Sequence, residues 1–467
     1  MKKLLFFLVL IFISNNLSAQ NDNYTTAINN FQTLYNSEKY DAVFNSLSPE
    51  MQAVMPLESA KKFLAGLKSQ AGKITSKKLT TKEGSTAIYK TDFERAQLEI
   101  HITLNNNNKI SGLLIQPVTE KKSATERETA NALNSYPKEI SEIIFSKTKD
   151  FPENTQVSIA IIKNGITIYY GILKSDQSLK TAENQTKVFE IGSLTKVFTA
   201  TVLASLVADK KVKLTDEINR FYPFPFKNNV KITFETLANH TSGLPRLPSN
   251  INLSDISNPY KNYGSDQLYE YLKNGLNLQN KSEKKYDYSN LGAGLLGNTL
   301  AVSQKTTFTE LLQKRIFDRF KMNNSYTNSK DLGSKLVEGL NADGQKVSNW
   351  DFDVLFGGGG ILSTTEDLSK FATAQFDLKN TDLTLTRTPT FTVSEKMKIG
   401  LGWHILKTQS GKNLFWHNGG TAGYSSSMVV DTDNKTAVVI LSNVSSFNPK
   451  MGNIDQLCFE LMKEIGK

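Results

Sequence analysis

Cysteine and histidine, on which many metal and redox sites depend, are scarce in this chain. Its 467 residues include one cysteine, Cys458, and four histidines scattered along the sequence. A single cysteine excludes an internal disulfide, and its place on the apolar face of a predicted terminal helix makes Cys458 a poor nucleophile. The metal-binding motif His-Glu-x-x-His does not occur. The sequence therefore predicts no metal site and no cofactor.

Signatures of nucleotide and nucleic-acid binding are also missing. The four-glycine run that begins at Gly357 lacks the Gly-Lys-Ser/Thr ending of a phosphate loop, and we interpret it as a turn. The pattern Gly-x-Ser-x-Gly, which carries the nucleophile of α/β-hydrolases, appears nowhere. The net charge of +10 is spread without a basic stripe interleaved with aromatic residues. We therefore expect no nucleic-acid partner.

A long apolar run occurs only at the amino terminus. Lys2 and Lys3 precede the apolar residues 4–13, and Leu17-Ser-Ala19 ends in a small residue suited to cleavage. The run is shorter than the roughly 20 residues of a membrane-spanning helix. Residues 1–19 are predicted to be a signal peptide, with an uncleaved anchor as the alternative. The mature chain would have no membrane span and would be exported, either periplasmic or secreted.

The sequence does contain a serine at the start of a strongly apolar helical pattern. After Ser193-Leu-Thr-Lys196, apolar residues recur with the three- and four-residue spacing of an amphipathic helix. The same Ser-x-x-Lys spacing occurs at four other serines, so only this context distinguishes Ser193. The first N–H groups of a helix lack partners and lie at the positive end of its dipole, where they stabilise negative charge. Ser193 is the predicted nucleophile.

Two side chains are predicted to move the proton of Ser193. Lys196 lies one helical turn further on the same face, and a lysine becomes a base when burial or nearby positive charge lowers its pKa. The motif Tyr288-Ser-Asn290 supplies a phenol that can share this task and an amide that can orient Lys196 or a substrate. Either Lys196 or Tyr288 can be the base, because two coupled groups titrate as a pair. At Tyr260, where Tyr-x-Asn recurs, we interpret the motif as a turn.

The third motif lies in the part of the chain richest in strand patterns. Apolar segments separated by turn residues predict an antiparallel meander over residues 402–441. His417 ends one of these strands and is followed by Asn418, Gly419 and Gly420. Because glycine has no side chain, a substrate can approach the backbone closely there. We predict that the N–H groups of Ser193 and Gly420 form an oxyanion hole.

These three motifs, in this order, resemble those of the serine β-lactamase and penicillin-binding-protein superfamily, in particular its class C-like branch. The resemblance extends from about residue 135 to the end and includes the blocks 237–245, 357–368 and 400–403. It implies an α+β fold, with an antiparallel sheet flanked by helices and a helical region beside it. It also implies catalytic roles for Ser193, Lys196 and Tyr288 and substrate-binding roles for Asn290, His417, Gly419 and Gly420.

Position 417 departs from the β-lactamase pattern, in which a lysine begins a Lys-Thr-Gly triplet. A lysine is a permanent cation suited to a substrate carboxylate, whereas an unperturbed imidazole titrates near about 6.5 and is mostly neutral at pH 7. Together with the resemblance, His417 predicts an envelope esterase or D-peptidase acting on a small-molecule ester, amide or cell-wall peptide. Two alternatives stay open: a β-lactamase or DD-carboxypeptidase, and a non-catalytic penicillin or peptide sensor.

A separate domain is predicted before the hydrolase domain. Residues 20–117 show helical patterns followed by alternating strand patterns over 87–93, 96–104 and 109–116, which indicate a small α+β unit. This order resembles the cone-shaped nuclear-transport-factor-like domains. Charged residues with little apolar pattern predict a linker or short exposed helix over 118–134. The hydrolase domain then covers 135–467 and opens with a helix and a hairpin, whose turn is Lys163-Asn-Gly165.

Overall fold

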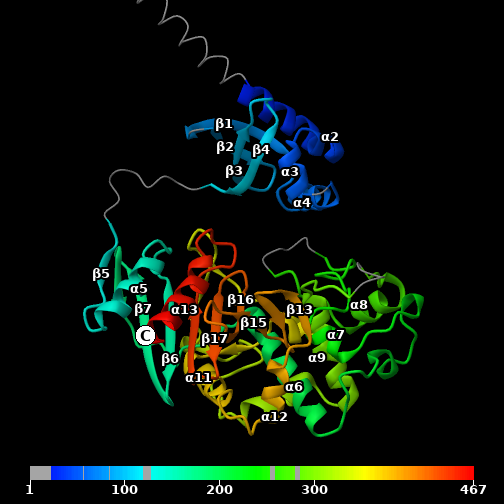
Figure 1. The fold of residues 1–467 in the computed structure, drawn as a ribbon, viewed down its shortest axis with the longest axis vertical. Helices are drawn as coiled ribbons and strands as arrows, with labels where there is room; N and C mark the ends of the chain where they lie inside the picture. Colours follow the sequence, from blue (N-terminus) through cyan, green and yellow to red (C-terminus); the bar gives the residue numbers. More distant parts are fainter. Residues whose placement is uncertain are drawn as a thin grey trace, which may run out of the picture. The chain divides into compact units, whose positions relative to one another are not determined.

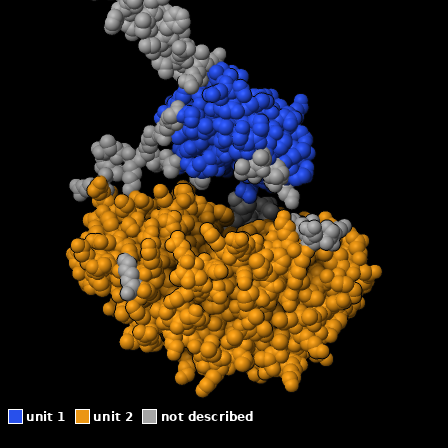
Figure 2. Space-filling view, in the orientation of Figure 1, with its two compact units in different colours: residues 1–126 blue, residues 127–467 orange. Residues whose placement is uncertain are grey.

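The computed structural model describes residues 23–55, 57–83, 85–118, 128–252, 258–278 and 284–466. The chain divides into two compact units, residues 1–126 and 127–467, which Figure 2 colours separately. The predicted signal peptide, residues 1–19, lies outside the described residues. Within the described ranges, none of the helices has the length and apolarity needed to cross a bilayer.

The smaller unit packs helices against an antiparallel sheet (Figure 1). Its helices are residues 23–36, α2 (Tyr40–Asn45), α3 (Pro49–Val54) and α4 (Leu57–Ala71), and its strands, in spatial order, are β1 (Ile74–Glu83), β2 (Thr86–Phe93), β3 (Gln97–Leu104) and β4 (Ile110–Pro117). Side chains alternate between the two faces of β3, so Ile100 and Ile102 point into a core that also contains Phe31 and Tyr35. The three predicted strands are confirmed as β2, β3 and β4. Strand β1 was not predicted, because its residues are mostly polar, which an edge strand tolerates.

The larger unit is built on one ten-stranded sheet. Its strands, in spatial order, are β13 (Phe391–Ser394), β14 (Met397–Ile399), β15 (His404–Lys407), β16 (Asn413–Gly420), β17 (Ser425–Asp431), β18 (Thr436–Ser442), β6 (Gln156–Lys163), β7 (Ile166–Ser175), β8 (Ser178–Thr181) and β5 (Ala130–Ala132). The predicted meander is confirmed as β15 to β18, and the predicted hairpin as β6 and β7. Strand β18 pairs with β6, so segments from the two ends of this unit complete the sheet.

Strand β5 falls in the stretch that the sequence predicts as a linker. Residues 130–132 pair in parallel with β8 and form one edge of the large sheet. Their sequence, Ala-Asn-Ala, is short and carries no alternating apolar pattern, so nothing local indicates a strand. Two short two-stranded pairs complete the β structure: β9 (Phe189–Glu190) with β12 (Leu362–Ser363), and β10 (Gly339–Leu340) with β11 (Lys346–Val347).

Helices cover both faces of the large sheet (Figure 1). On one face, α5 (Lys138–Thr148) and α13 (Gly452–Ile465) pack on alternate residues of β18, Val438 and Ile440. The intervening residues, Val439 and Leu441, join the core that contains α6 (Thr195–Ala208). The other helices of this unit are α7 (Phe234–Ala238), α8 (Ser265–Glu270), α9 (Asn290–Gln304), α10 (Phe308–Leu312), α11 (Thr365–Ala374) and α12 (Thr381–Arg387). The predicted α+β fold is confirmed.

Helix α6 is buried around its whole circumference rather than along one stripe. Lys196, Thr199 and Thr201 are buried together with its apolar residues. The hydroxyl of Thr199 donates to Gly357 O (2.8 Å). This polar side chain therefore has its hydrogen-bond partner inside the protein and does not need to face solvent. The apolar spacing after Ser193 predicts a buried helix, which the structure confirms. Its polar positions are buried as well, so α6 is the central helix of the unit.

Candidate active site

Ser193 lies in a 3-10 turn, Gly192–Leu194, between β9 and α6. Helix α6 thus begins two residues later than predicted. Gly192 has a φ of +52°, in the left-handed region that glycine adopts without strain. A Cβ added at Gly192 would lie 2.5 Å from the backbone N of Gly420. The turn that carries Ser193 is therefore in direct contact with the end of strand β16.

The ammonium group of Lys196 is enclosed by three oxygen atoms. Nζ donates to Ser193 Oγ (2.9 Å), Asn290 Oδ1 (2.9 Å) and the carbonyl of Gly358 (2.6 Å). Burial lowers the pKa of Lys196 well below its usual value, and the positive charge of Arg246 lowers it further. No carboxylate contacts Nζ in the part of the chain that the structure describes. The site therefore favours the neutral amine.

A neutral Lys196 fits this set of partners. It keeps two N–H groups, enough for Asn290 Oδ1 and Gly358 O, and gains one lone pair. That lone pair can accept a hydrogen bond from Ser193, whose oxygen lies 2.9 Å away. The arrangement thus brings a buried amine within reach of the proton that a serine nucleophile must lose.

Tyr288 lies directly before helix α9, whose N-cap Ser289 accepts a hydrogen bond from Gly292 N (2.8 Å). Its ring centre is 4.8 Å from Lys196 Nζ and 4.5 Å from the His240 ring. Burial raises the pKa of Tyr288, and hydrogen bonding to Ser193 opposes that effect only in part. The phenol is therefore protonated near neutral pH and can donate or relay a proton beside Ser193.

Asn290 connects Lys196 to a second tyrosine. Its Oδ1 accepts from Lys196, and its Nδ2 donates to Tyr260 Oη (2.8 Å). The buried Tyr260 ring is stacked on Phe352, with ring centres 4.5 Å apart. The predicted turn at Tyr260 is confirmed, since Tyr263 N donates to Tyr260 O (3.0 Å). The Tyr260 side chain also fixes the orientation of the Asn290 amide, which the sequence did not indicate. One N–H of that amide is left for a substrate.

His417 lies near the end of β16 and is buried. Its Nδ1 is 2.6 Å from the carbonyl oxygen of Asn418, and since a carbonyl only accepts, Nδ1 carries the proton. Nε2 is then an acceptor, and it has no hydrogen-bond partner among the described residues. Burial, with smaller effects from His404 and Lys196, lowers the pKa of His417 well below its usual value. The imidazole is therefore neutral.

Two further histidines lie in the wall of the same site. The His404 ring centre is 5.1 Å from that of His417, and His404 Nε2 is 3.0 Å from Tyr286 Oη. His240 Nδ1 accepts a hydrogen bond from Ser289 N (3.2 Å), and the His240 ring packs on the ring of Tyr288. Three of the four histidines thus converge, although they are scattered in the sequence. Even so, no group of His, Cys, Asp and Glu side chains in the described ranges could hold a metal ion.

The structure brings all seven predicted site residues together. Ser193, Lys196 and Asn290 form one hydrogen-bonded group, Tyr288 packs against it, and the 417–420 end of β16 closes one side. Sequence reasoning missed the Gly358 carbonyl, Tyr260, His404 and Arg246. The glycine run was the available signal for the first, since Gly357 and Gly358 lie in contact with the backbone of α9.

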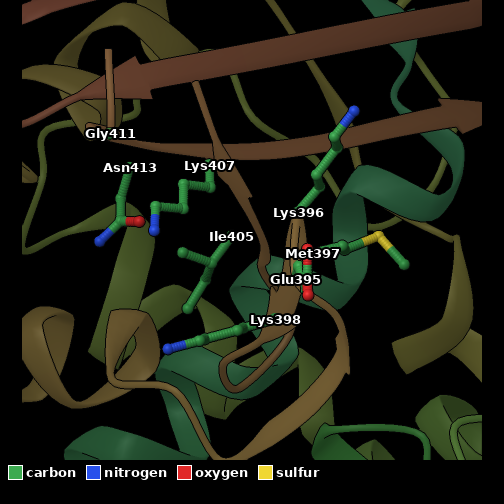
Figure 3. Close-up of a pocket in the computed structure, with 8 residues that line it drawn as sticks. All are labelled: Glu395, Lys396, Met397, Lys398, Ile405, Lys407, Gly411 and Asn413. Carbon is green, nitrogen blue, oxygen red and sulfur yellow. The ribbon is translucent and has the colours of Figure 1, made fainter. Parts of the chain in front are cut away.

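A groove elsewhere on this unit contains none of these residues. Figure 3 shows its lining, which consists of Glu395, Lys396, Met397, Lys398, Ile405, Lys407, Gly411 and Asn413. These residues come from β14, β15, the start of β16 and the connecting turns. The side chains offer charge but no nucleophile paired with a base. This groove therefore offers no alternative to the catalytic group around Ser193.

Family models match both units. Residues 147–459 match the family described as Beta-lactamase, and residues 29–113 match a family described as a protein of unknown function, DUF3887. The nuclear-transport-factor-like character of the smaller unit stays a prediction.

Curated relatives are distant. Protein flp of Staphylococcus aureus strain MRSA252 is 24% identical over 315 residues, which cover 63% of this chain and 60% of the relative. A protein of Escherichia coli K12 named Beta-lactamase is 25% identical over 291 residues, covering 58% of this chain and 72% of the relative. The chain thus spans about three fifths of the length of the staphylococcal relatives that it matches.

Solved structures share the fold of the larger unit. A β-lactamase/D-alanine carboxypeptidase from Pseudomonas syringae has a TM-score of 0.59 at 20% identity, covering 70% of this chain and 98% of that one. An octameric penicillin-binding protein homologue from Pyrococcus abyssi gives 0.58 at 22% identity, covering 70% and 77%. A class C β-lactamase gives 0.58 at 20% identity, covering 69% and 96%. The predicted class C-like architecture is confirmed.

Proposed function

Because the chain belongs to the Beta-lactamase family, whose fold is that of serine hydrolases, we propose that it is a serine hydrolase that forms an acyl-enzyme on Ser193. One observation carries the proposal: the buried Lys196 Nζ lies 2.9 Å from Ser193 Oγ and has a lowered pKa. A non-catalytic penicillin or peptide sensor would not need a lysine held in its basic form beside a serine.

In the first step, Lys196 accepts the Ser193 proton while Oγ attacks the carbonyl carbon of an ester or amide. A C–O bond forms and the carbonyl π electrons move to oxygen, where the N–H groups of Ser193 and Gly420 stabilise the charge. A single oxyanion donor is worth about 100- to 1000-fold in rate. Tyr288 protonates the leaving alcohol or amine as its bond to the acyl carbon breaks, and it takes the Ser193 proton over from Lys196. Lys196 is then neutral and Tyr288 protonated again before water attacks. Water then attacks the acyl-enzyme by the same route and restores Ser193.

The state of His417 favours esterase or D-peptidase activity over penicillin hydrolysis. Its neutral ring offers the unpartnered Nε2 as an acceptor, so position 417 suits an N–H or O–H of the substrate rather than a carboxylate. Asn290 and the glycine backbone at Gly419 and Gly420 would bind the rest of the acyl group. A β-lactamase or DD-carboxypeptidase is the second candidate, since relatives with this fold bear those names.

The proposed setting of this activity is the cell envelope. Residues 1–19 have the charge and apolar pattern of a signal peptide, which supports export to the periplasm or the medium. We assign residues 20–117 to an accessory domain, 118–134 to the connection and 135–467 to the hydrolase domain. The sequence gives the smaller unit no catalytic set, and the roles open to it are to guide substrate, to bind the cell wall, to mediate dimerisation or to act as a spacer.

Turnover tests the proposal directly. The mature protein and its Ser193→Ala variant are assayed with p-nitrophenyl butyrate, a peptide ending in D-Ala-D-Ala and benzylpenicillin. Hydrolysis of the ester that is lost in Ser193→Ala supports the proposed activity. Release of D-Ala from the peptide that is lost in Ser193→Ala is DD-carboxypeptidase activity and supports the second candidate. Efficient hydrolysis of benzylpenicillin supports the second candidate instead, and no turnover of any of the three would reject both.

A further inference from the structure

Arg246 lies at the mouth of the proposed active site. The side chain is exposed, and its guanidinium carbon is 5.4 Å from the centre of the Tyr288 ring. Its backbone carbonyl accepts a hydrogen bond from Leu291 N (3.1 Å), in the first turn of α9. The backbone at Arg246 is thus tied to the element that carries Asn290, so its side chain starts from a fixed point beside the nucleophile.

The positive charge of Arg246 reaches the groups around Ser193. It lowers the pKa of Lys196, and it also opposes the effect of burial on the pKa of Tyr288 and of Tyr260. Arg95, Arg220, Arg315 and Arg319 are paired with carboxylates, as Arg220 is with Asp216 (2.7 Å), whereas the buried Arg387 is not. No such ion pair involves Arg246 within the described ranges. Its charge is therefore available to a ligand.

The other basic groups of the site do not supply a lasting positive charge. Burial lowers the pKa of Lys196, His240 and His417, so all three favour their neutral forms. The hydrogen bonds of Lys196 are already used inside the protein. An arginine, in contrast, stays charged at every working pH and presents a planar set of N–H donors that matches a carboxylate.

The geometry points to Arg246 as a specificity residue that binds a carboxylate on the substrate, in a position beside the Tyr288 ring. This inference rests on the proposed acyl-transfer function and adds the substrate class: esters or amides whose acyl part carries a second, anionic group. The positive charge would then come from the loop that follows α7 and not from strand β16. The ring of Tyr288 below the guanidinium restricts its orientation.

A pair of substrates that differ by one charge tests this inference. The full mature chain is assayed with the p-nitrophenyl monoester of adipic acid and with p-nitrophenyl hexanoate, whose acyl chains have equal length. For Arg246→Gln we expect the ratio of kcat/KM, adipate over hexanoate, to fall about 5- to 20-fold, since one exposed charge-assisted contact is lost. Arg246→Lys should keep part of the ratio. Any change in the pKa of Lys196 affects both esters and cancels in the ratio.

Arg220→Gln is the matched control, because it removes an exposed arginine that pairs with Asp216 outside the site. A wild-type ratio in an active Arg246→Gln would overturn the inference and leave the proposed function intact. A wild-type protein that hydrolyses neither ester would instead reject the proposed ester hydrolysis, and the inference with it. Should Arg246→Gln not fold, added salt must lower the wild-type ratio, since it screens an exposed charge. A ratio independent of salt contradicts the inference.

Discussion

Gly419 passes so close to the turn of Ser193 that a Cβ added to it would lie 2.8 Å from Ser193 N and 2.0 Å from Ile191 O. The neighbouring strand holds the same carbonyl, because Ser426 Oγ donates to Ile191 O (2.8 Å). Backbone atoms on both sides of this contact leave no room for a side chain. Because Gly419 has no side chain, strand β16 can lie directly against the turn that carries Ser193.

We expect Gly419→Ala to reduce activity at least about 100-fold, because the strand must move away from Ser193 and carry Gly420 N with it. Initial rates with a p-nitrophenyl ester measure the loss, and circular dichroism establishes that the fold is kept. Gly452→Ala is the control: Gly452 begins α13 and a Cβ there meets nothing within 4 Å. Equal activity of Gly419→Ala and wild type would contradict the proposed arrangement of the oxyanion hole.

The Lys196→Arg variant keeps a positive charge at position 196 but removes the group that can accept a proton. Arginine keeps the donors but does not lose its proton in the accessible pH range, so we expect acylation to fall at least about 1000-fold. In the wild type, kcat/KM should fall as the pH decreases through the lowered pKa of Lys196, because only the neutral amine accepts a proton. Lys187→Arg, at an exposed lysine that donates to Ser334 O, should be neutral. A wild-type profile whose activity rises only near the usual lysine pKa would contradict the assignment.

Tyr288→Phe removes the phenol and keeps the ring that packs on His240 and Lys196. We expect the acylation rate, measured as a burst of p-nitrophenol, to fall about 100- to 10,000-fold with little change in stability. Tyr326→Phe is the control, since Tyr326 begins another Tyr-x-Asn and its hydroxyl donates to Asn324 Oδ1 (3.4 Å). Full activity of Tyr288→Phe would remove Tyr288 from the mechanism.

Glu190 should make stability depend on pH. Its buried carboxyl accepts from Asn349 Nδ2 (2.7 Å) and Trp350 N (2.8 Å), and burial raises its pKa to about 7. An unfolded glutamate titrates near about 4.3, so its stabilising contribution is complete below about pH 4 and is lost as the pH rises through about 7.

The pKa shift of Glu190 corresponds to at most about 4 kcal/mol of folding free energy. We expect the Tm of Glu190→Gln to fall less between about pH 5 and 8 than that of wild type, because glutamine does not ionise. Glu217→Gln, at an exposed carboxylate, should behave as wild type. Thermal unfolding at several pH values measures this, and parallel curves for Glu190→Gln and wild type would contradict it.

Local sequence spacing was sufficient where the functional groups share one element. Ser193 and Lys196 are one turn apart, so helix geometry alone places their side chains together. His417, Gly419 and Gly420 follow one another closely in one predicted strand of the meander, so the sequence also predicts that they lie together at its end. The roles of all these residues stay predictions, because the comparisons address the family and the fold.

Contacts between distant segments could not be predicted in the same way. The glycine run at Gly357 and Gly358 is a signal of close backbone packing, but it does not indicate that the carbonyl of Gly358 faces Lys196. Asn290 and Tyr260 are 30 residues apart in the sequence, so only the tertiary fold brings them together. His404 lies beside His417 even though the register of β15 and β16 opposes it to Trp416, so strand alternation alone would place it on the face away from His417.

The intact mass of the mature protein after brief exposure to a fluorophosphonate tests the central claim most directly. We predict one covalent adduct per chain in the wild type and none in Ser193→Ala, because only an activated serine reacts quickly with this reagent. An unmodified wild type, or an adduct that persists in Ser193→Ala, would contradict the assignment of Ser193 as the nucleophile.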